Sequence, residues 1–278
     1  MAKKQAVQIN SADGAVRELS KLFTSFHRHG TYQVFTDFLT LAACSISNAM
    51  DKRFYDEREK QYMDTIKRYS KEEADKFPLM LALLVQTFEP VPGVVVYRDA
   101  LGELFMELEL GSQWSGQYFT PYPVALMKAH MVLGDADSLR DDIQKRGFVR
   151  AMEPCVGGGA LVIATADAFQ QLGINYQQHL HFSCIDVDIK AVHMAYIQLS
   201  LLHIPAVIVH GNALSMEEWS RWFTPSHLLG MWDTKLRRDY DEGETIVQEI
   251  VDAVRPEPVE TVSGIEEELD TLGQLTLF

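Results

Sequence analysis

The segment GFVRAMEPCVGGGALVIATADAFQQLG (residues 147–173) decides the fold that we predict for this chain. Its first residues are apolar and predict a short strand. The three consecutive glycines, Gly157 to Gly159, predict a tight turn, because glycine adopts backbone angles that other residues avoid. The apolar residues that follow predict a helix that stops at Gly173. The segment is therefore a strand, a glycine-rich turn and a helix.

The sequence beyond this segment continues the same alternation. HLHFSCIDVD (179–188) predicts a strand with acidic residues at its end, DIKAVHMAYIQLSLLHI (188–204) a helix, and PAVIVHGNAL (205–214) a strand that closes on Gly211-Asn212. Strands and helices that alternate with short connections form half of a doubly wound parallel sheet. We therefore predict an α/β, Rossmann-like fold, in complete or abbreviated form, with its ligand at the carboxyl ends of the strands.

The first hundred residues differ, because their apolar spacing predicts helices. We expect helices over 31–50, 55–73, 77–88 and 98–110, with Asp99 as the N-cap and Gly111 as the stop of the last. In the first of these, one broad apolar face is formed by Val34, Phe35, Phe38, Leu39, Leu41 and Ala42. The sequence thus predicts a helical domain over residues 1–115 and an α/β core over 116–238.

The remaining residues, 239–278, are acidic and predict a flexible tail. The chain of 278 residues has a net charge of −14, but twelve acidic residues and one basic residue lie after Arg238, so this tail carries −11 and residues 1–238 only −3. The acidic total therefore says little about what the folded part binds.

Composition excludes several classes of protein. The sequence has no uncharged apolar run long enough for a membrane span and no signal peptide. The three cysteines, Cys44, Cys155 and Cys184, lie far apart, which argues against a disulfide scaffold and against a CxxC metal site. We expect a reduced, cytoplasmic protein with no metal.

The glycine turn carries an acidic residue in EPCVGGGA (153–160). A phosphate-binding P-loop needs Gly-Lys-Ser/Thr and a dinucleotide loop needs GxGxxG, and neither pattern is present. Glu153 would repel a pyrophosphate but would bind a cationic group, such as an ammonium or a sulfonium. The alternative is a glycine-rich turn that binds nothing.

Polar residues also end the next two predicted strands. The carboxylates of Asp186 and Asp188 suit the two hydroxyls of a ribose, and the amide of Asn212 suits an adenine edge. Each residue alone could instead be an N-cap or a turn residue. Together with the glycine turn they describe a site for S-adenosylmethionine.

At these residues the chain resembles the adenine-specific DNA amino-methyltransferases, especially the modification subunits of type I restriction systems and short methylase-like proteins of phages and plasmids. The resemblance extends from about Leu101 to Leu214. It rests on GQYFTP (116–121), EPCVGGGAL (153–161), IDVD (185–188) and GNAL (211–214). It implies that the cofactor is lined by Gln117, Phe119, Thr120, Pro121, Glu153, Cys155, Gly157, Gly159, Asp186 and Asn212.

One motif of that family is missing. The family uses Asn/Asp-Pro-Pro-Tyr/Phe to activate the amine of a flipped adenine, but this sequence contains no Pro-Pro. The nearest candidates are Thr224, Pro225 and His227. The segment before them, SMEEWSRWF (215–223), has a residue pattern typical of a helix. We expect Trp219, Trp222 and Phe223 in the core.

Two segments suggest macromolecular partners. Lys235, Arg237 and Arg238 form a basic cluster that either contacts a DNA backbone or ends a solvated helix. Residues Gln274, Leu275, Leu277 and Phe278 resemble the QL(S/D)LF peptide by which bacterial replication and repair proteins dock on the β sliding clamp. The alternative is that this peptide folds back on the body.

We therefore expect a cytoplasmic S-adenosylmethionine-dependent adenine DNA methyltransferase of the phage or plasmid type, with DNA and the sliding clamp as partners. A second hypothesis is a catalytically impaired relative that binds the cofactor or DNA and evades restriction through a specificity or partner subunit. A third is a small-molecule methyltransferase, because the chain has no length for a target-recognition domain.

Overall fold

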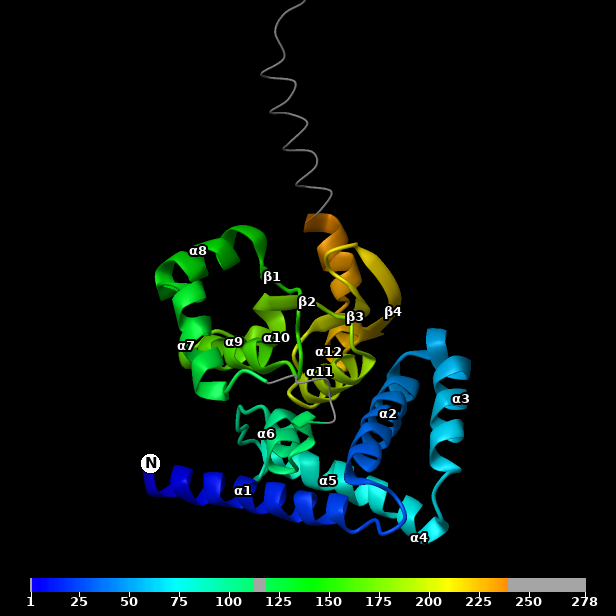
Figure 1. Ribbon diagram of the computed structural model, residues 1–278. Helices are drawn as coiled ribbons and strands as arrows, with labels where there is room; N and C mark the ends of the chain where they lie inside the picture. The colour runs from blue at the N-terminus through cyan, green and yellow to red at the C-terminus, as the bar shows by residue number, and fades with distance from the viewer. Residues whose placement is uncertain (1, 113–118, 240–278) are drawn as a thin grey trace, which may run out of the picture. The chain divides into compact units, whose positions relative to one another are not determined.

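This computed structural model describes residues 2–112 and 119–239 (Figure 1). By its internal contacts the chain divides into a compact unit of residues 1–234 and a second unit of residues 235–278. The predicted boundary between residues 115 and 116 falls inside the first unit. The predicted tail and its terminal peptide lie, from residue 240 onward, outside the described residues.

The amino-terminal part of the first unit is helical, as predicted. The buried residues of its second helix include every member of the predicted apolar face, so that prediction is confirmed. In order, the elements are α1 (Ala2–Thr24), α2 (Thr31–Met50), η1 (Lys52–Phe54), α3 (Tyr55–Ile66), α4 (Lys71–Ala74), α5 (Lys76–Phe88), α6 (Ala100–Glu107) and η2 (Leu110–Ser112).

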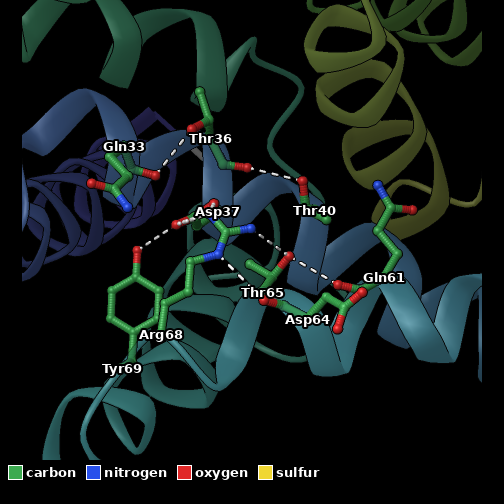
Figure 2. Close-up of polar contacts among 9 residues, drawn as sticks. All are labelled: Gln33, Thr36, Asp37, Thr40, Gln61, Asp64, Thr65, Arg68 and Tyr69. Atoms are coloured by element: carbon green, nitrogen blue, oxygen red, sulfur yellow. Dashed lines mark hydrogen bonds and ion pairs between the residues drawn. The ribbon is translucent and has the colours of Figure 1, made fainter.

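A buried carboxylate ties α2 to the turn that follows α3, and α2 and α3 lie side by side in Figure 1. Figure 2 shows Asp37 of α2 facing Arg68 and Tyr69. Asp37 accepts hydrogen bonds from Arg68 Nη1 (3.1 Å) and from Tyr69 Oη (2.7 Å). Burial and the neighbouring carboxylate raise the pKa of the Tyr69 hydroxyl, which therefore stays a hydrogen-bond donor.

The second half of the unit is an α/β sheet with the strand order β1-β2-β3-β4. The first three strands are parallel, and β4 pairs with β3 in the antiparallel direction. The strands are β1 (Val149–Glu153), β2 (Leu180–Asp186), β3 (Ala206–Asn212) and β4 (Glu217–Phe223). The predicted α/β class with a Rossmann-like parallel core is confirmed, and it is abbreviated because β1 is an edge of the sheet within the described residues.

Helices connect and cover the strands. Around the sheet these are α7 (Tyr122–Leu133), α8 (Ala136–Arg146), α9 (Ala160–Gln171), α10 (Tyr176–His179), α11 (Ile189–Leu201) and α12 (Pro225–Leu229). Helix α11 contacts both the sheet and α2, and its residues Ala191 to Ser200 are all buried. A helix that is apolar on all sides belongs in a core. The helical part and the sheet consequently share one hydrophobic core, which runs from Leu19 to Trp222.

Four local predictions are wrong. Residues 217–223 form β4 and not a helix, so a fourth strand is present. In that strand Trp222 and Phe223 are buried as expected, but Trp219 is half exposed. The expected helix over 55–73 breaks after Ile66, where Ser70 and Glu73 form a capping box for α4. Finally, α6 ends at Glu107, so Gly111 is not its stop. No helix of the described part is long and apolar enough to cross a bilayer.

Candidate functional site

The turn between β1 and α9 is a rigid glycine loop. Gly157 and Gly159 have φ angles of +54° and +96°, in the left-handed region that glycine tolerates best. The backbone closes on itself through a hydrogen bond from Gly159 N–H to the carbonyl oxygen of Val156 (2.9 Å). Val156 N–H in turn donates to the carbonyl oxygen of Ile185 in β2 (2.9 Å), so the loop is anchored to the sheet.

The loop opens into a cavity of about 190 Å³, which we call the hollow. This volume is below the roughly 300–1,000 Å³ of a typical small-molecule site, so the hollow suits one end of a larger ligand. Five of the predicted cofactor residues meet here, among them Glu153 at the end of β1. The lining residues are Phe119, Thr120, Ala125, Lys128, Glu153, Cys155, Val156, Gly157, Gly158, Ala160 and Leu161.

Asp186, at the end of β2, is bound directly to the loop. Its Oδ2 accepts a hydrogen bond from Gly157 N–H (2.9 Å), and its Oδ1 accepts one from Asp188 N–H (2.9 Å). A carboxylate has about four lone-pair positions, so two remain for a ligand such as a ribose. Asp188 instead caps α11 by accepting from Lys190 N–H (2.9 Å), which is the structural alternative considered for it.

Asn212, at the end of β3, has a turn role. Its Oδ1 accepts hydrogen bonds from Leu214 N–H (2.9 Å) and Ser215 N–H (3.3 Å). Both lone pairs of that oxygen are therefore used, and the side chain can only donate to a ligand through Nδ2. Asn212 does not line the hollow. We predicted that the Asn212 amide would donate one hydrogen bond to an adenine edge and accept another. This geometry does not allow both.

Two buried polar residues, Gln198 and Asp99, are hydrogen-bonded to each other beside the glycine loop. Gln198 of α11 donates from Nε2 to the carbonyl oxygen of Gly158 (2.7 Å) and to Asp99 Oδ1 (2.7 Å). The same carboxylate oxygen accepts from Gly102 N–H (2.9 Å), which confirms Asp99 as the N-cap of α6. Burial raises the pKa of the Asp99 carboxyl. These contacts join α6, the glycine loop and α11, and the sequence analysis did not find them.

The Phe-Thr-Pro segment and α7 form the other side of the hollow. Phe119 contacts the ring of Phe105 at 5.1 Å in an edge-on geometry, and an added Cβ at Gly157 would lie 3.4 Å from the Phe119 ring. Thr120 lines the hollow, whereas Pro121 immediately precedes α7 and does not. The predicted residue Gln117 lies outside the described residues. Lys128 of α7 also lines the hollow and was not predicted.

No protein-family model matches this sequence. No curated protein matches it either. Among solved structures, the chain is similar to a candidate class I S-adenosylmethionine-dependent methyltransferase from Listeria monocytogenes. The two chains share 14% sequence identity with a TM-score of 0.38, over 74% of this chain and 54% of that chain. The chain thus spans about half the length of that protein.

The three catalytic candidates lie near the amino-terminal end of β3, whereas the glycine loop lies at the carboxyl ends of the parallel strands. Thr224 is fully buried, and its N–H donates to the carbonyl oxygen of Ala206 (3.1 Å), the first residue of β3. The glycine loop is at the other end of the strands, about 20 Å away along the seven residues of β3. His227 is also buried, and its Nδ1 shares a hydrogen bond with His181 Nε2 (2.9 Å). Thr224, Pro225 and His227 are therefore structural, and Pro225 starts α12.

Proposed function

We propose that this protein binds S-adenosylmethionine through the hollow and the ends of β1 and β2, and that it is a methyltransferase whose acceptor is the exocyclic amine of adenine in DNA. The observation that carries this proposal is the position of Glu153. Glu153 lines the hollow beside a glycine loop that is itself hydrogen-bonded to the carboxylate of Asp186.

The residues present fit this cofactor. Glu153 would bind the ammonium group, because a carboxylate at the hollow is a charge-assisted acceptor. Asp186 would take ribose hydroxyls with the lone pairs that the loop leaves available. The glycines leave room that a Cβ would fill, and Phe119 covers Gly157 with an apolar surface. When bound, S-adenosylmethionine supplies a methyl group that its sulfonium makes reactive.

Adenine in DNA is proposed as the acceptor because of the order and spacing of the sequence motifs between Leu101 and Leu214. The test is transfer of a tritiated methyl group to single- and double-stranded DNA, followed by nucleoside analysis. We expect label in N6-methyladenine. Label in small molecules alone would replace DNA with a small-molecule acceptor.

Cofactor binding is tested separately by calorimetry with S-adenosylhomocysteine. We expect Glu153→Gln and Asp186→Asn each to weaken binding about tenfold, because each loses a charge-assisted hydrogen bond worth on the order of 1.5 kcal/mol. Glu153→Gln keeps the shape of the side chain, so its thermal melting should be close to that of the wild type. Asp186→Asn places an amide N–H where one carboxylate oxygen now accepts from Gly157 N–H or Asp188 N–H, so its melting temperature should fall, and its affinity is compared under conditions where it remains folded. Unchanged affinity in both variants would contradict the proposed site.

A second candidate function is cofactor or DNA binding without methyl transfer, in restriction evasion with a partner subunit. It is favoured by the sheet itself. In a doubly wound sheet the strands of the second half continue beyond β1, whereas β1 is an edge within the part of the chain that the structure describes. Cofactor binding together with no transfer to any DNA would support this candidate over the first.

We also propose that residues 274–278 dock on the β sliding clamp. The support is the residue types, because Gln274 can hydrogen-bond while Leu275, Leu277 and Phe278 offer apolar anchors. Deletion of these five residues should abolish association with purified clamp in a pull-down and leave the melting temperature unchanged. Association that survives the deletion would contradict the docking.

A further inference from the structure

Two opposite charges line the hollow without neutralising each other. Glu153 contributes a carboxylate from the end of β1, and Lys128 contributes an ammonium group from α7. Among the described residues no ion pair joins these two side chains, although both border the same 190 Å³ space; Glu153 Oε1 instead accepts a hydrogen bond from Cys155 N–H (3.2 Å). A cavity with one separate charge of each sign is complementary to a zwitterion.

We propose that Lys128 binds the carboxylate of the amino-acid end of the ligand, so that Lys128 and Glu153 together select a free α-amino acid group. This inference rests on the proposed function and adds to it the chemistry that the hollow recognises. The ammonium of the ligand goes to Glu153, and its carboxylate goes to Lys128.

The position of Lys128 is fixed by the packing of α7 on α9. Small residues, Ala125 and Ala129 of α7, and Ala160, Ala164 and Ala168 of α9, form a separate buried cluster between these helices. Small side chains let two helix backbones approach closely. Lys128 is next to Ala129 and one turn from Ala125, which itself lines the hollow. The lysine therefore starts from a backbone position beside the loop.

A hydrogen bond fixes the same helix at its start. Tyr122, the first residue of α7, donates from Oη to Asp167 Oδ2 of α9 (2.8 Å). Burial and that carboxylate raise the pKa of the Tyr122 hydroxyl, so it remains protonated. The α7–α9 contact is thus held by this hydrogen bond and by the alanine cluster, and only the exposed side chain of Lys128 has to be ordered on binding.

The first residues of α9 add to the positive electrostatic potential that Lys128 creates in the hollow. Ala160 and Leu161, the first residues of this helix, line the hollow. Helix N-termini carry a partial positive charge and N–H groups without helical partners. The start of α9 therefore favours an anion in the hollow, whereas Glu153 favours a cation.

The test compares S-adenosylmethionine with its decarboxylated form, which keeps the ammonium and the sulfonium but lacks the carboxylate. For the wild-type protein we expect the first ligand to bind three- to tenfold more tightly by calorimetry, as suits one partly exposed charge pair. In Lys128→Met this preference should fall to the smaller share that the start of α9 supplies, and Lys128→Arg should restore it. Lys128 is exposed, so the variants should fold, which circular dichroism will check.

Two control variants distinguish the effect of Lys128 from that of Glu153 and from the loss of any surface lysine. Lys145→Met removes an exposed lysine of α8 that does not line the hollow, and it should keep the wild-type preference. Glu153→Gln should weaken both ligands equally, because both carry the ammonium. A wild-type protein with no preference, or a preference that Lys128→Met leaves unchanged, would overturn the role of Lys128. A wild-type protein that binds neither ligand would instead overturn the proposed function.

Discussion

The hydroxyl group of Thr224 is a structural contact at the amino-terminal edge of the sheet. It donates to the carbonyl oxygen of Ile204 (2.9 Å) and accepts from Ala206 N–H (3.0 Å), in a fully buried position. One side chain therefore satisfies two backbone groups where β3 begins. The adjacent residues belong to α12, so this hydroxyl also fixes the turn from β4 into that helix.

We predict that Thr224→Val lowers the free energy of unfolding by about 1–3 kcal/mol, because it leaves a buried N–H and a buried carbonyl without partners. Urea unfolding followed by circular dichroism measures this loss. The affinity for S-adenosylhomocysteine should stay at the wild-type value. A loss of affinity at wild-type stability would return Thr224 to the binding site.

At the scale of elements, the glycine loop offers a matched pair of substitutions. Gly157 and Gly173 precede and follow α9, and both have left-handed φ angles, +54° and +71°. Alanine costs on the order of 1–2 kcal/mol in this conformation at either position. An added Cβ at Gly157 would lie 3.4 Å from the Phe119 ring, whereas one at Gly173 would meet no heavy atom within 4 Å.

We therefore predict that Gly157→Ala and Gly173→Ala lower the urea midpoint by similar amounts, and that only Gly157→Ala weakens cofactor binding. Calorimetry under conditions where both variants remain folded makes the comparison. If both variants lose the same affinity, the effect comes from general stability and the loop does not contact the ligand.

The elements that the sequence predicts correctly are those with a long, regular apolar pattern. Helix α2 and strands β2 and β3 are of this kind, because most of their positions are apolar and buried. Strand β1 is also predicted correctly, although it is short and only partly buried. Residues 217–223 mislead because Trp219, Trp222 and Phe223 have helix-like spacing. Their strand is set by pairing with β3, which local spacing does not reveal. The break before α4 was detectable, since Ser70-Lys-Glu-Glu is a capping-box sequence.

At the site, the sequence predicts the residues inside the motifs and misses those brought in by packing. Glu153, Cys155 and Gly157 are neighbours in the chain, and the structure places them together in the hollow. Lys128 and Gln198 are distant in sequence and carry no motif of their own. They lie at the loop only because α7 packs on α9 and because Gln198 of α11 hydrogen-bonds to Gly158.

For the molecule as a whole, two buried histidines make stability depend on pH. Burial lowers the pKa of His193 to about 3, and burial likewise lowers the pKa of His227 although Asp233 opposes it. In the unfolded chain both imidazoles have a pKa near ~6.5. Below that value the unfolded chain binds protons that the folded chain does not. The stability is therefore complete above about pH 6.5 and falls as the pH decreases.

We predict a lower urea midpoint at pH 5.5 than at pH 7.5, with a slope of up to about 1.4 kcal/mol per pH unit for each histidine. His193→Gln should reduce this dependence, since glutamine does not titrate. A slope that is the same in His193→Gln and in the wild type would contradict the role of His193. Most carboxylates contribute at lower pH, because their ordinary pKa values are about 4. The Asp99 carboxyl, whose pKa burial raises, acts in the opposite direction, because its stabilising effect is lost as the pH rises.

The three thiols differ sharply in their access to solvent. Cys44 and Cys184 are fully buried, and burial raises both of their pKa values, that of Cys44 to about 12. Cys155 is exposed and borders the hollow. A maleimide dye should accordingly attach to the native protein at Cys155 alone, and Cys155→Ser should abolish labelling. Saturating S-adenosylhomocysteine should slow the reaction, so this thiol would report occupancy without any engineered tag.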